Sequence, residues 1–457
     1  MRARLLAIAS LLLVPTASAQ EMNRQAFPIG EEALQLGGAY TGYARDASAG
    51  YYNPGGLVFG RAGSVGLSLS VNLRDAYDVA GGSTDASALE YSDAFGVPLY
   101  AGGAVTIGGD ETGEGRHALA ATTLSPSQGG RNFTLAEQIG PLTRYQRVER
   151  RDYTRWYGAS YAYRPLEWLG VGLTAFVATR SFEHREATVA ADAGVRASAS
   201  EVSLSAELLL FRIGALVRPI PQLTVGLMFQ PPAIVVGARA NARATRADGT
   251  TTLFANEDLQ ASSPLPFQIR LGAAWQPERS LLLSGDLILE GPQGSESDPV
   301  RRVVFAGPRG LLGTYLETEW WSDVTFDVAL GGRAVIEDVV PVSVSFFTSV
   351  SAAPTPLAGD AYRPDQVDLF GATLSVGFIR EGVQFSIGLL GSLGFGSGLR
   401  AGPFDSTGPP SYTVADVSTQ TLYLFLSGAG AAVDAIAETV AETLDTDVQD
   451  GREDEED

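Results

Sequence analysis

The sequence predicts an all-β fold, an antiparallel transmembrane β-barrel of about 14 strands. Three observations lead to this prediction. The chain opens with an export signal. It is rich in apolar residues, yet no run of eighteen is uninterrupted, as a spanning helix would need. Its alternating apolar and polar segments are joined by connections that are long and short in turn, which is typical of barrels that cross a membrane with strands.

The start of the chain has the three-part layout of a secretory signal peptide. Two arginines are followed by ten apolar residues, 5–14, and then by small residues at 17–19 that a signal peptidase recognises. We therefore predict a signal peptide over 1–19 and a mature chain that starts at Gln20. The sequence has no cysteine, which excludes disulfide bonds and a lipid anchor on a cysteine.

The composition favours burial by alternation. Hydrophobic residues make up 45% of the chain and charged residues only 18%, whereas soluble proteins carry about 25% charged residues. The net charge is −20, so we expect no nucleic-acid binding, because phosphate contacts need a surplus of basic side chains.

Half of the net charge lies at the end of the chain. Residues 433–457 hold eleven acidic residues against one arginine, and such runs are usually solvated. Val433, Ile436, Val440 and Leu444 recur at helical spacing. We expect 429–457 to form a short helix and then an acidic disordered tail that a periplasmic partner could bind; a marginal helix that frays is the alternative.

The predicted barrel extends over 63–428. In its first strand Val65, Leu67 and Leu69 alternate with serine and glycine, a pattern that a soluble sandwich shares. The predicted strands are 63–74, 99–107, 117–125, 150–163, 168–182, 202–218, 222–237, 267–276, 281–290, 323–336, 341–352, 367–379, 383–395 and 414–428.

The connections separate a barrel from a sandwich. Odd-numbered connections have at least fourteen residues and even-numbered ones at most nine. Short periplasmic turns and long external loops give this alternation, and an even strand count places both termini in the periplasm. We therefore expect the bacterial outer membrane, with lipid as a partner. The predicted long connections are 75–98, 126–149, 183–201, 238–266, 291–322, 353–366 and 396–413.

Aromatic residues near the strand ends are candidates for the two interfacial girdles. Ordinary packing within or beside a strand is the alternative for each of them. The candidates are Trp156, Tyr157, Trp168, Tyr423 and Phe425.

The segment 20–62 lies outside the strand alternation. It contains Gly37-Gly38-Ala39-Tyr40, then Asp46-Ala47-Ser48, then Tyr52-Asn53-Pro54-Gly55-Gly56-Leu57. This order and spacing resemble the N-terminal hatch of the FadL/TodX family of outer-membrane transport proteins for long-chain fatty acids and hydrocarbons. The likeness is strong only in the hatch, although weaker pieces extend over most of the mature chain.

The resemblance implies a hatch, or plug, packed inside the barrel lumen. It assigns Gly37, Gly38, Asp46, Asn53 and Pro54 to the hatch motif, together with Gly55, where the family usually has Ala. It also implies a kinked third strand that opens a lateral passage, and Pro126 marks either that kink or the end of a strand. Aromatic hatch residues are candidates to line the ligand pocket: Phe27, Tyr40, Tyr43, Tyr51 and Tyr52.

The expected function is passive uptake of hydrophobic small molecules, such as long-chain fatty acids or aromatic hydrocarbons, through a greasy lumen gated by the hatch. The alternative is a barrel that does not transport but binds a protein or forms part of a secretion channel. An aqueous porin is disfavoured, because a hatch would block it. A candidate loop capture patch, with packing between loops as the alternative, consists of Phe305, Leu311, Leu312, Tyr315, Trp320 and Trp321.

Catalytic chemistry finds little support. His117 and His184 are the only histidines, and neither lies in a metal-ligand pattern. The sequence has no P-loop and no G-x-S-x-G elbow. We therefore expect no enzyme activity, no cofactor and no metal, and a monomer that meets outer-membrane lipid and a hydrophobic small-molecule substrate.

Overall fold

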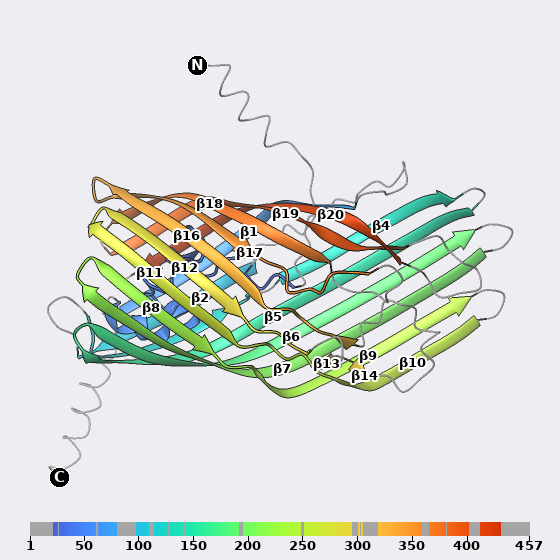
Figure 1. The fold of residues 1–457 in the computed structure, drawn as a ribbon, viewed down its shortest axis with the longest axis horizontal. Helices are drawn as coiled ribbons and strands as arrows, with labels where there is room; N and C mark the ends of the chain where they lie inside the picture. Colours follow the sequence, from blue (N-terminus) through green and yellow to red (C-terminus); the bar gives the residue numbers. More distant parts are fainter. Residues whose placement is uncertain are drawn as a thin grey trace, which may run out of the picture.

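The computed structural model is a closed antiparallel barrel of fourteen strands. Each wall strand pairs with its neighbours in chain order, and β1 (Gly63–Val79) pairs with both β2 (Val97–Ile107) and β20 (Tyr412–Gly430), which closes the ring. Figure 1 shows the tilted strands, with short turns at one end and long hairpins at the other. The predicted all-β class and strand count are confirmed.

The other wall strands are β3 (His117–Leu124), β5 (Leu142–Leu166), β6 (Leu169–Ala191), β7 (Val195–Ile220), β8 (Leu223–Gln230), β11 (Gln268–Glu278), β12 (Leu281–Glu290), β16 (Thr325–Ile336), β17 (Val340–Ser349), β18 (Gln366–Arg380) and β19 (Val383–Ala401). Outside this ring order lie β4 (Gln128–Ile139), β9 (Ile234–Ala247), β10 (Thr251–Ala261), β13 (Val300–Arg301), β14 (Val303–Val304) and β15 (Glu319–Trp320).

The structure describes residues 22–25, 27–60, 63–79, 97–108, 114–126, 128–139, 142–191, 195–247, 251–294, 300–301, 303–304, 319–357, 365–380, 382–401 and 412–430. The predicted signal peptide and the predicted helical and acidic tail lie outside these residues, except for Ala429 and Gly430, which end β20. Among the described residues, no helix has the length and apolar character needed to cross a membrane.

The wall strands present apolar side chains outward and small or polar side chains inward. On β18, Phe370 and Leu374 are exposed, whereas Thr373 and Ser375, on either side of Leu374, are buried. The same alternation recurs around the ring, so the exposed apolar side chains form the band that lipid would cover. The expectation of an apolar lumen is therefore wrong for most of the wall, whose inner face carries serine, threonine and charged residues.

Two of the proposed girdle residues point the other way. Trp156 and Phe425 are buried on the inner face of the wall, whereas Tyr157 and Trp168 are exposed on the outside. Tyr423 is partly buried against Phe27 of the N-terminal segment. Strand parity decides these positions, because neighbouring residues such as Trp156 and Tyr157 must face opposite sides.

Three wall strands are much longer than a membrane requires. β5, β6 and β7 have 25, 23 and 26 residues, whereas about 9–11 tilted residues cross a bilayer. The predicted long connections 126–149, 183–201 and 238–266 therefore hold paired strands rather than open loops. We call the outer parts of β5, β6 and β7, together with β4, β9 and β10, the hairpin wall.

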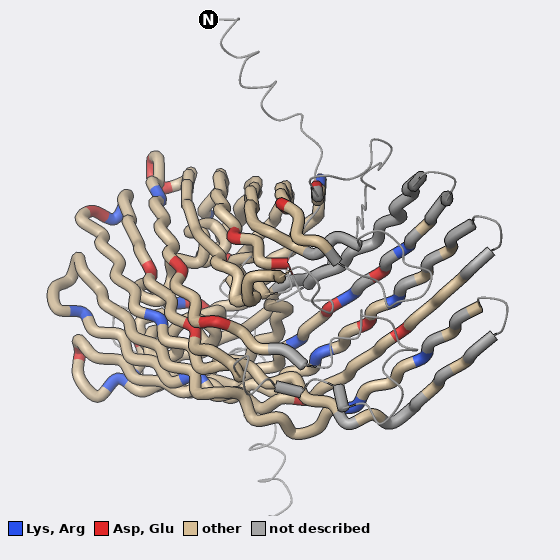
Figure 2. The backbone as a smooth tube through the Cα atoms, turned by 45° about the vertical axis from the view of Figure 1, so that its right-hand side comes forward, with Lys and Arg blue, Asp and Glu red and all other residues tan. Residues whose placement is uncertain are grey.

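The ladder continues in the hairpin wall, where charged side chains occupy many of the outward positions. One outward row consists of Glu149, Arg185, Glu201 and Arg243, each directly opposite the next across neighbouring strands. Figure 2 shows these alternating acidic and basic positions along the hairpins. Opposite charges across a ladder stabilise pairing in water, where no apolar outer face is needed.

Candidate functional site

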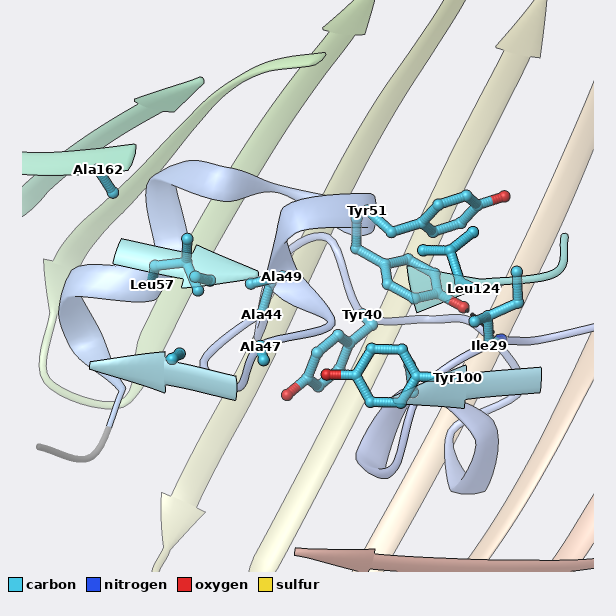
Figure 3. Packing of buried hydrophobic residues seen from close by; sticks show 14 of the residues in the cluster. Ile29, Tyr40, Ala44, Ala47, Ala49, Tyr51, Leu57, Tyr100, Leu124 and Ala162 are labelled. Atoms are coloured by element: carbon cyan, nitrogen blue, oxygen red, sulfur yellow. Dashed lines mark hydrogen bonds between the residues drawn. The ribbon is translucent and has the colours of Figure 1, made fainter. Parts of the chain in front are cut away.

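The N-terminal segment, residues 22–25 and 27–60, is seated inside the ring. It contains helices α2 (Glu32–Gln35) and α3 (Ala49–Tyr52) and the 3-10 helix η2 (Pro54–Phe59). Its side chains are largely buried, and it touches wall strands on every side of the lumen. Figure 3 shows its apolar residues gathered against the wall, with Tyr40 beside Tyr100 of β2.

The motif glycines serve two different purposes. Gly37 and Gly38 have φ values of 64° and 82°, the left-handed conformation that ends α2 and that glycine adopts without strain. Gly55 instead allows close approach: a Cβ there would lie 2.7 Å from the carbonyl oxygen of Gly170 and 2.8 Å from that of Gly214. Here the segment meets the wall backbone to backbone.

The polar motif residues hold the turns of the segment. Asn53 is fully buried, donates to the carbonyl oxygens of Thr41 and Ala215 at 3.0 and 2.9 Å, and accepts from the Gly55 amide at 3.1 Å. Asp46 accepts from the amide and the hydroxyl of Ser48 at 2.8 and 2.5 Å. These residues tie the segment to itself and, through Asn53, to β7.

The five aromatic candidates do not converge on one pocket. Tyr51 lines a cavity on the long-hairpin side of the segment, and Tyr43 lines a vestibule at the short-turn end. Tyr40 and Tyr52 pack edge to face at 5.6 Å within the segment, and Phe27 packs edge to face on Tyr423. Tyr51 is thus the candidate nearest to an enclosed space.

This upper cavity has a volume of about 100 Å³ and lies between the segment and the wall. Its apolar lining includes Tyr51, Trp156 and Leu208, and its polar lining includes Arg212 and Glu290. A cavity of this size is comparable to the ~150 Å³ cavity that takes up one benzene molecule. The upper cavity therefore has room for one ring or for part of a chain.

An apolar track leads to the upper cavity along the inner face of β7. Val202, Leu204, Ala206, Leu208 and Leu210 are all buried and alternate with more exposed residues. The track begins in the hairpin wall and ends at Arg212, the next inward residue of β7 after Leu210. This strip is the part of the lumen that does match the expected apolar lining.

Arg212, at the end of the track, is a buried cation that only neutral groups contact. Only 1% of its surface is exposed. It donates to the carbonyl oxygen of Tyr51 and to Gln230 at 2.9 Å, and its guanidinium carbon lies 3.8 Å from the Tyr51 ring centre. Among the described residues, no carboxylate lies within ion-pair distance of it. Its charge is thus available to an anionic group that enters the cavity.

The first residues of the segment form a strap beside the upper cavity. Arg24 pairs with Glu290 of β12 at 3.1 Å, and Gln25 donates to the same carboxylate at 2.9 Å. Asn23 donates to the carbonyl oxygens of Ser349 and Val367 at 2.6 and 2.8 Å. The strap therefore joins β12 to β17 and β18 by polar contacts.

The third wall strand is interrupted where it borders the cavity. β3 pairs with β5 as far as Leu124 opposite Trp156, and β4 resumes at Gln128 opposite Tyr153. Pro126, in the interruption, lines the upper cavity. Pro126 thus lies in a break between β3 and β4 rather than at the end of the strand, because β4 continues along the same partner. Proline has no amide to donate to a ladder.

A second space lies at the short-turn end. This lower vestibule has a volume of about 440 Å³ and is lined by Glu32, Tyr43, Asp46 and Arg333, among others. Arg333 of β16 donates to Glu32 at 2.8 Å and to the Tyr43 hydroxyl at 3.1 Å. Among the described residues, no cluster of side chains could hold a metal ion.

Several site predictions cannot be placed. Of the loop capture patch, Phe305, Leu311, Leu312 and Tyr315 lie outside the described residues, and only the backbone of Trp320 is described. Trp321 is partly buried. Conversely, two charged wall residues that line the upper cavity, Arg212 and Glu290, were not predicted. A lone charged residue within an apolar strand was the signal available for them.

A closed fourteen-stranded barrel with an N-terminal segment in its lumen is the class of protein that this structure defines. No family model and no curated protein matches the sequence. Solved structures do match the fold. A Pseudomonas aeruginosa FadL homologue is 15% identical with a TM-score of 0.56, over 92% of this chain and 99% of that one.

Two further solved structures show the same fold. The Ralstonia pickettii toluene transporter TbuX is 13% identical with a TM-score of 0.58, covering 90% of this chain and 99% of its own. The P. putida toluene transporter TodX is 11% identical with a TM-score of 0.58, covering 87% and 97%. The resemblance to the FadL/TodX proteins is therefore confirmed at the level of the fold.

Proposed function

We propose that this protein is an outer-membrane channel for passive uptake of hydrophobic small molecules, with the N-terminal segment as its gating hatch. One observation carries the proposal: the upper cavity lies between the segment and the wall, meets the apolar track of β7 and reaches the strand break at Pro126. Structural neighbours named as transporters, and not as enzymes, support this assignment and a non-enzymatic role.

In the proposed orientation the short turns face the periplasm and the hairpin wall faces outward. Gly430, the last residue of β20, then lies on the periplasmic side, because it pairs with Val65 near the start of β1. Met22 lies at the other end of the lumen, where its carbonyl oxygen accepts from the amide of Ala352. An even number of strands therefore does not fix the side of the membrane on which the N-terminus lies, because the segment that precedes β1 crosses the lumen.

We infer that the preferred substrate carries an acidic end as well as an apolar body. Structural neighbours are named as transporters of toluene, as a monoaromatic hydrocarbon channel and as a FadL homologue. In this chain the track ends on Arg212, which forms no ion pair with a described carboxylate. A long-chain fatty acid could place its chain on the track and its carboxylate at Arg212, whereas a pure hydrocarbon leaves this charge unused.

In the proposed path, release of the substrate is lateral. The strand break lies between the cavity and the outer face of the barrel, so a molecule in the cavity is separated from lipid only by the interrupted wall. An aqueous route would pass the tightly packed segment, which meets the wall at Gly55. The protein-binding or secretion alternative is not favoured, because solved structures with this fold are named as a hydrocarbon channel and as toluene transporters.

The test is uptake of labelled laurate and labelled toluene into proteoliposomes. The full chain should take up laurate, and Arg212→Met should lower laurate uptake roughly tenfold, as expected for loss of a hydrogen bond to a charged group. Toluene uptake should change little, since its path makes no ionic contact. Gly237→Ala is the matched control, because a Cβ at Gly237 meets nothing within 4 Å.

Absence of uptake by the intact, folded protein, together with co-purification of a protein partner, would refute the transport proposal. Equal loss of both substrates in Arg212→Met would leave transport standing but would refute the acidic end group. A variant lacking residues 20–60 should lose selectivity between laurate and small hydrophilic solutes if the segment is the hatch.

A further inference from the structure

The outer face of the barrel beside the strand break carries an unusual set of side chains. Tyr153, Arg155 and Tyr157 alternate along β5 and all point outward; the two tyrosines are 39% and 50% exposed. Thr154 and Arg155 lie opposite the interruption between β3 and β4, because the ladder ends at Trp156 on one side and resumes at Tyr153 on the other.

This set lies at the edge of the apolar band. Tyr157 faces Val177 on β6, and both side chains are exposed, as lipid-facing residues are. The next outward pair is Arg155 and Thr179, and beyond it come the charged rows of the hairpin wall. On the hairpin side of the apolar band, Arg155 is thus the nearest charged residue of β5, and tyrosines flank it where aromatic residues collect at membrane interfaces.

Arg155 differs from other arginines of the same surface in its partners. Farther out, Arg185 pairs with Glu183 and with Glu201 at 3.2 Å, and Arg151 pairs with Glu149 at 2.7 Å. Among the described residues, Arg155 has no ion pair and no side-chain hydrogen bond, and Thr179 stands directly opposite it. Its positive charge is therefore presented outward, at the level where the apolar surface ends.

We propose that Arg155 binds the phosphate of an outer-leaflet lipid, flanked by Tyr153 and Tyr157. The proposal rests on the orientation given above, in which the hairpin wall faces outward. Guanidinium groups bind phosphate oxygens by paired, charge-assisted hydrogen bonds, and lipid phosphates lie just beyond the hydrocarbon. The acyl chains of a lipid held there would lie over the strand break.

This lipid site has a consequence for the proposed lateral path. The break at Pro126 opens toward the same stretch of wall as Arg155, on which the bound lipid is seated. A substrate that leaves the cavity sideways would first meet the acyl chains of that lipid. The lipid thus supplies an apolar surface at the point where the β-ladder does not close the wall.

The experiment uses the full chain in nanodiscs of phosphatidylcholine that contain a small fraction of bisphosphorylated lipid A. Native mass spectrometry after release reads how much lipid A stays bound. Arg155→Gln should retain roughly tenfold less than the parent, the loss expected for a charge-assisted contact. Arg147→Gln is the matched control, because Arg147 is exposed on the same face of β5 but eight residues farther from the band.

Retention by Arg147→Gln should equal that of the parent, and dephosphorylated lipid A should bind weakly to every form. Equal retention by Arg155→Gln and the parent would overturn the lipid site, and so would equal losses in the two variants or equal binding of the dephosphorylated lipid. Laurate uptake in pure phosphatidylcholine is measured in parallel. Failure of uptake with selective lipid retention would refute the channel and leave the lipid site intact.

Discussion

At the scale of single residues, the surroundings of Gly55 explain why this chain has glycine where the hatch motif that it resembles usually has alanine. The wall backbone at Gly170 and Gly214 leaves no room for a Cβ. We predict that Gly55→Ala lifts the segment from β6 and β7 and destabilises its seating by about 1–3 kcal/mol, the usual cost of overpacking. Faster proteolytic release of the segment would show it.

Gly237→Ala provides the comparison for that release experiment, because its added methyl group meets open space. Both variants change only one hydrogen into a methyl group, so a difference between them reports the contact with the wall. Equal release rates for Gly55→Ala, Gly237→Ala and the parent would contradict a tight backbone contact at Gly55.

Asp46 makes the seating of the segment dependent on pH. Burial, reinforced by the charge of Glu32, raises the pKa of the Asp46 carboxyl to about 6, and the hydrogen bond from Ser48 opposes this shift. In the unfolded chain this group ionises near 3.8. Below that pH both states are protonated, and between about pH 4 and pH 6 only the unfolded state gains by ionising, so stability falls as pH rises.

The full loss above pH 6 is about 3 kcal/mol, from roughly 1.36 kcal/mol per pKa unit over the shift from 3.8 to about 6. Thermal unfolding or protease release of the segment, followed from pH 4 to pH 7, measures it. Asp46→Asn, which cannot ionise, should flatten this part of the profile. A variant profile as steep as the parent's would assign the pH dependence to another group.

The sequence could suggest the hatch motif, because its glycines and Asn53 form one linear stretch with fixed spacing. It did not predict Arg212 or Glu290. The wall strands that border the cavity contribute one to three residues each, and only strand register brings these residues together, so no linear pattern records the site. The charge of Arg212 amid Leu208, Leu209, Leu210, Phe211 and Ile213 was the single available signal.

At the scale of elements, the strand positions were predictable and their ends were not. Outward apolar side chains mark the part of each strand that lipid covers. Charged side chains take many of the outward positions where β5, β6 and β7 leave the predicted membrane band. Beyond that point the ladder is held by backbone pairing and by charge pairs such as Arg185 with Glu201. Water accepts polar residues on the outward face, so most hairpin strands lack the full period-two contrast, although β7 keeps apolar residues at its inward positions.

The charged row of the hairpin wall can be tested by reversing one member. Glu201→Arg places three positive charges side by side with Arg185 and Arg243. Because like charges directly opposite each other destabilise a ladder, we expect a loss of roughly 0.5–2 kcal/mol in the hairpins. Protease cleavage in the hairpin wall should accelerate, while the barrel itself keeps its heat-modifiable migration.

Adding Arg243→Glu to Glu201→Arg restores opposite charges between β7 and β9 and should recover part of the protection, because the other neighbour of residue 243 across the ladder is Ala255. A double variant as sensitive as Glu201→Arg would show that the row contributes through something other than charge pairing. Exposed pairs contribute little individually, so the comparison requires low ionic strength.

At the scale of the whole molecule, the polar inner wall and the segment depend on each other. Asp286 of β12 accepts from the amides of Tyr40 and Thr41, both at distances of 2.9 to 3.2 Å. Without the segment, such groups would be hydrated, and the lumen would become an aqueous pore.

We therefore predict that removal of residues 20–60 leaves a folded barrel with a much larger ionic conductance in planar bilayers. The wall strands keep all their ladder partners in this variant, so heat-modifiable migration should persist. A deletion variant that folds but stays closed would contradict the view that the segment blocks the lumen.

The order of assembly follows from the way the ring closes. The segment precedes β1 in the chain, yet Gln35 reaches Ser427 of β20, the last wall strand. The seam between β1 and β20, from Val65 opposite Gly430 to Val79 opposite Val417, forms only when the whole chain is present. The N-terminal segment is thus synthesised early but reaches its final position in the lumen late. During biogenesis it must be sheltered by the half-formed sheet or by chaperones, and any delay at this seam exposes it to proteases.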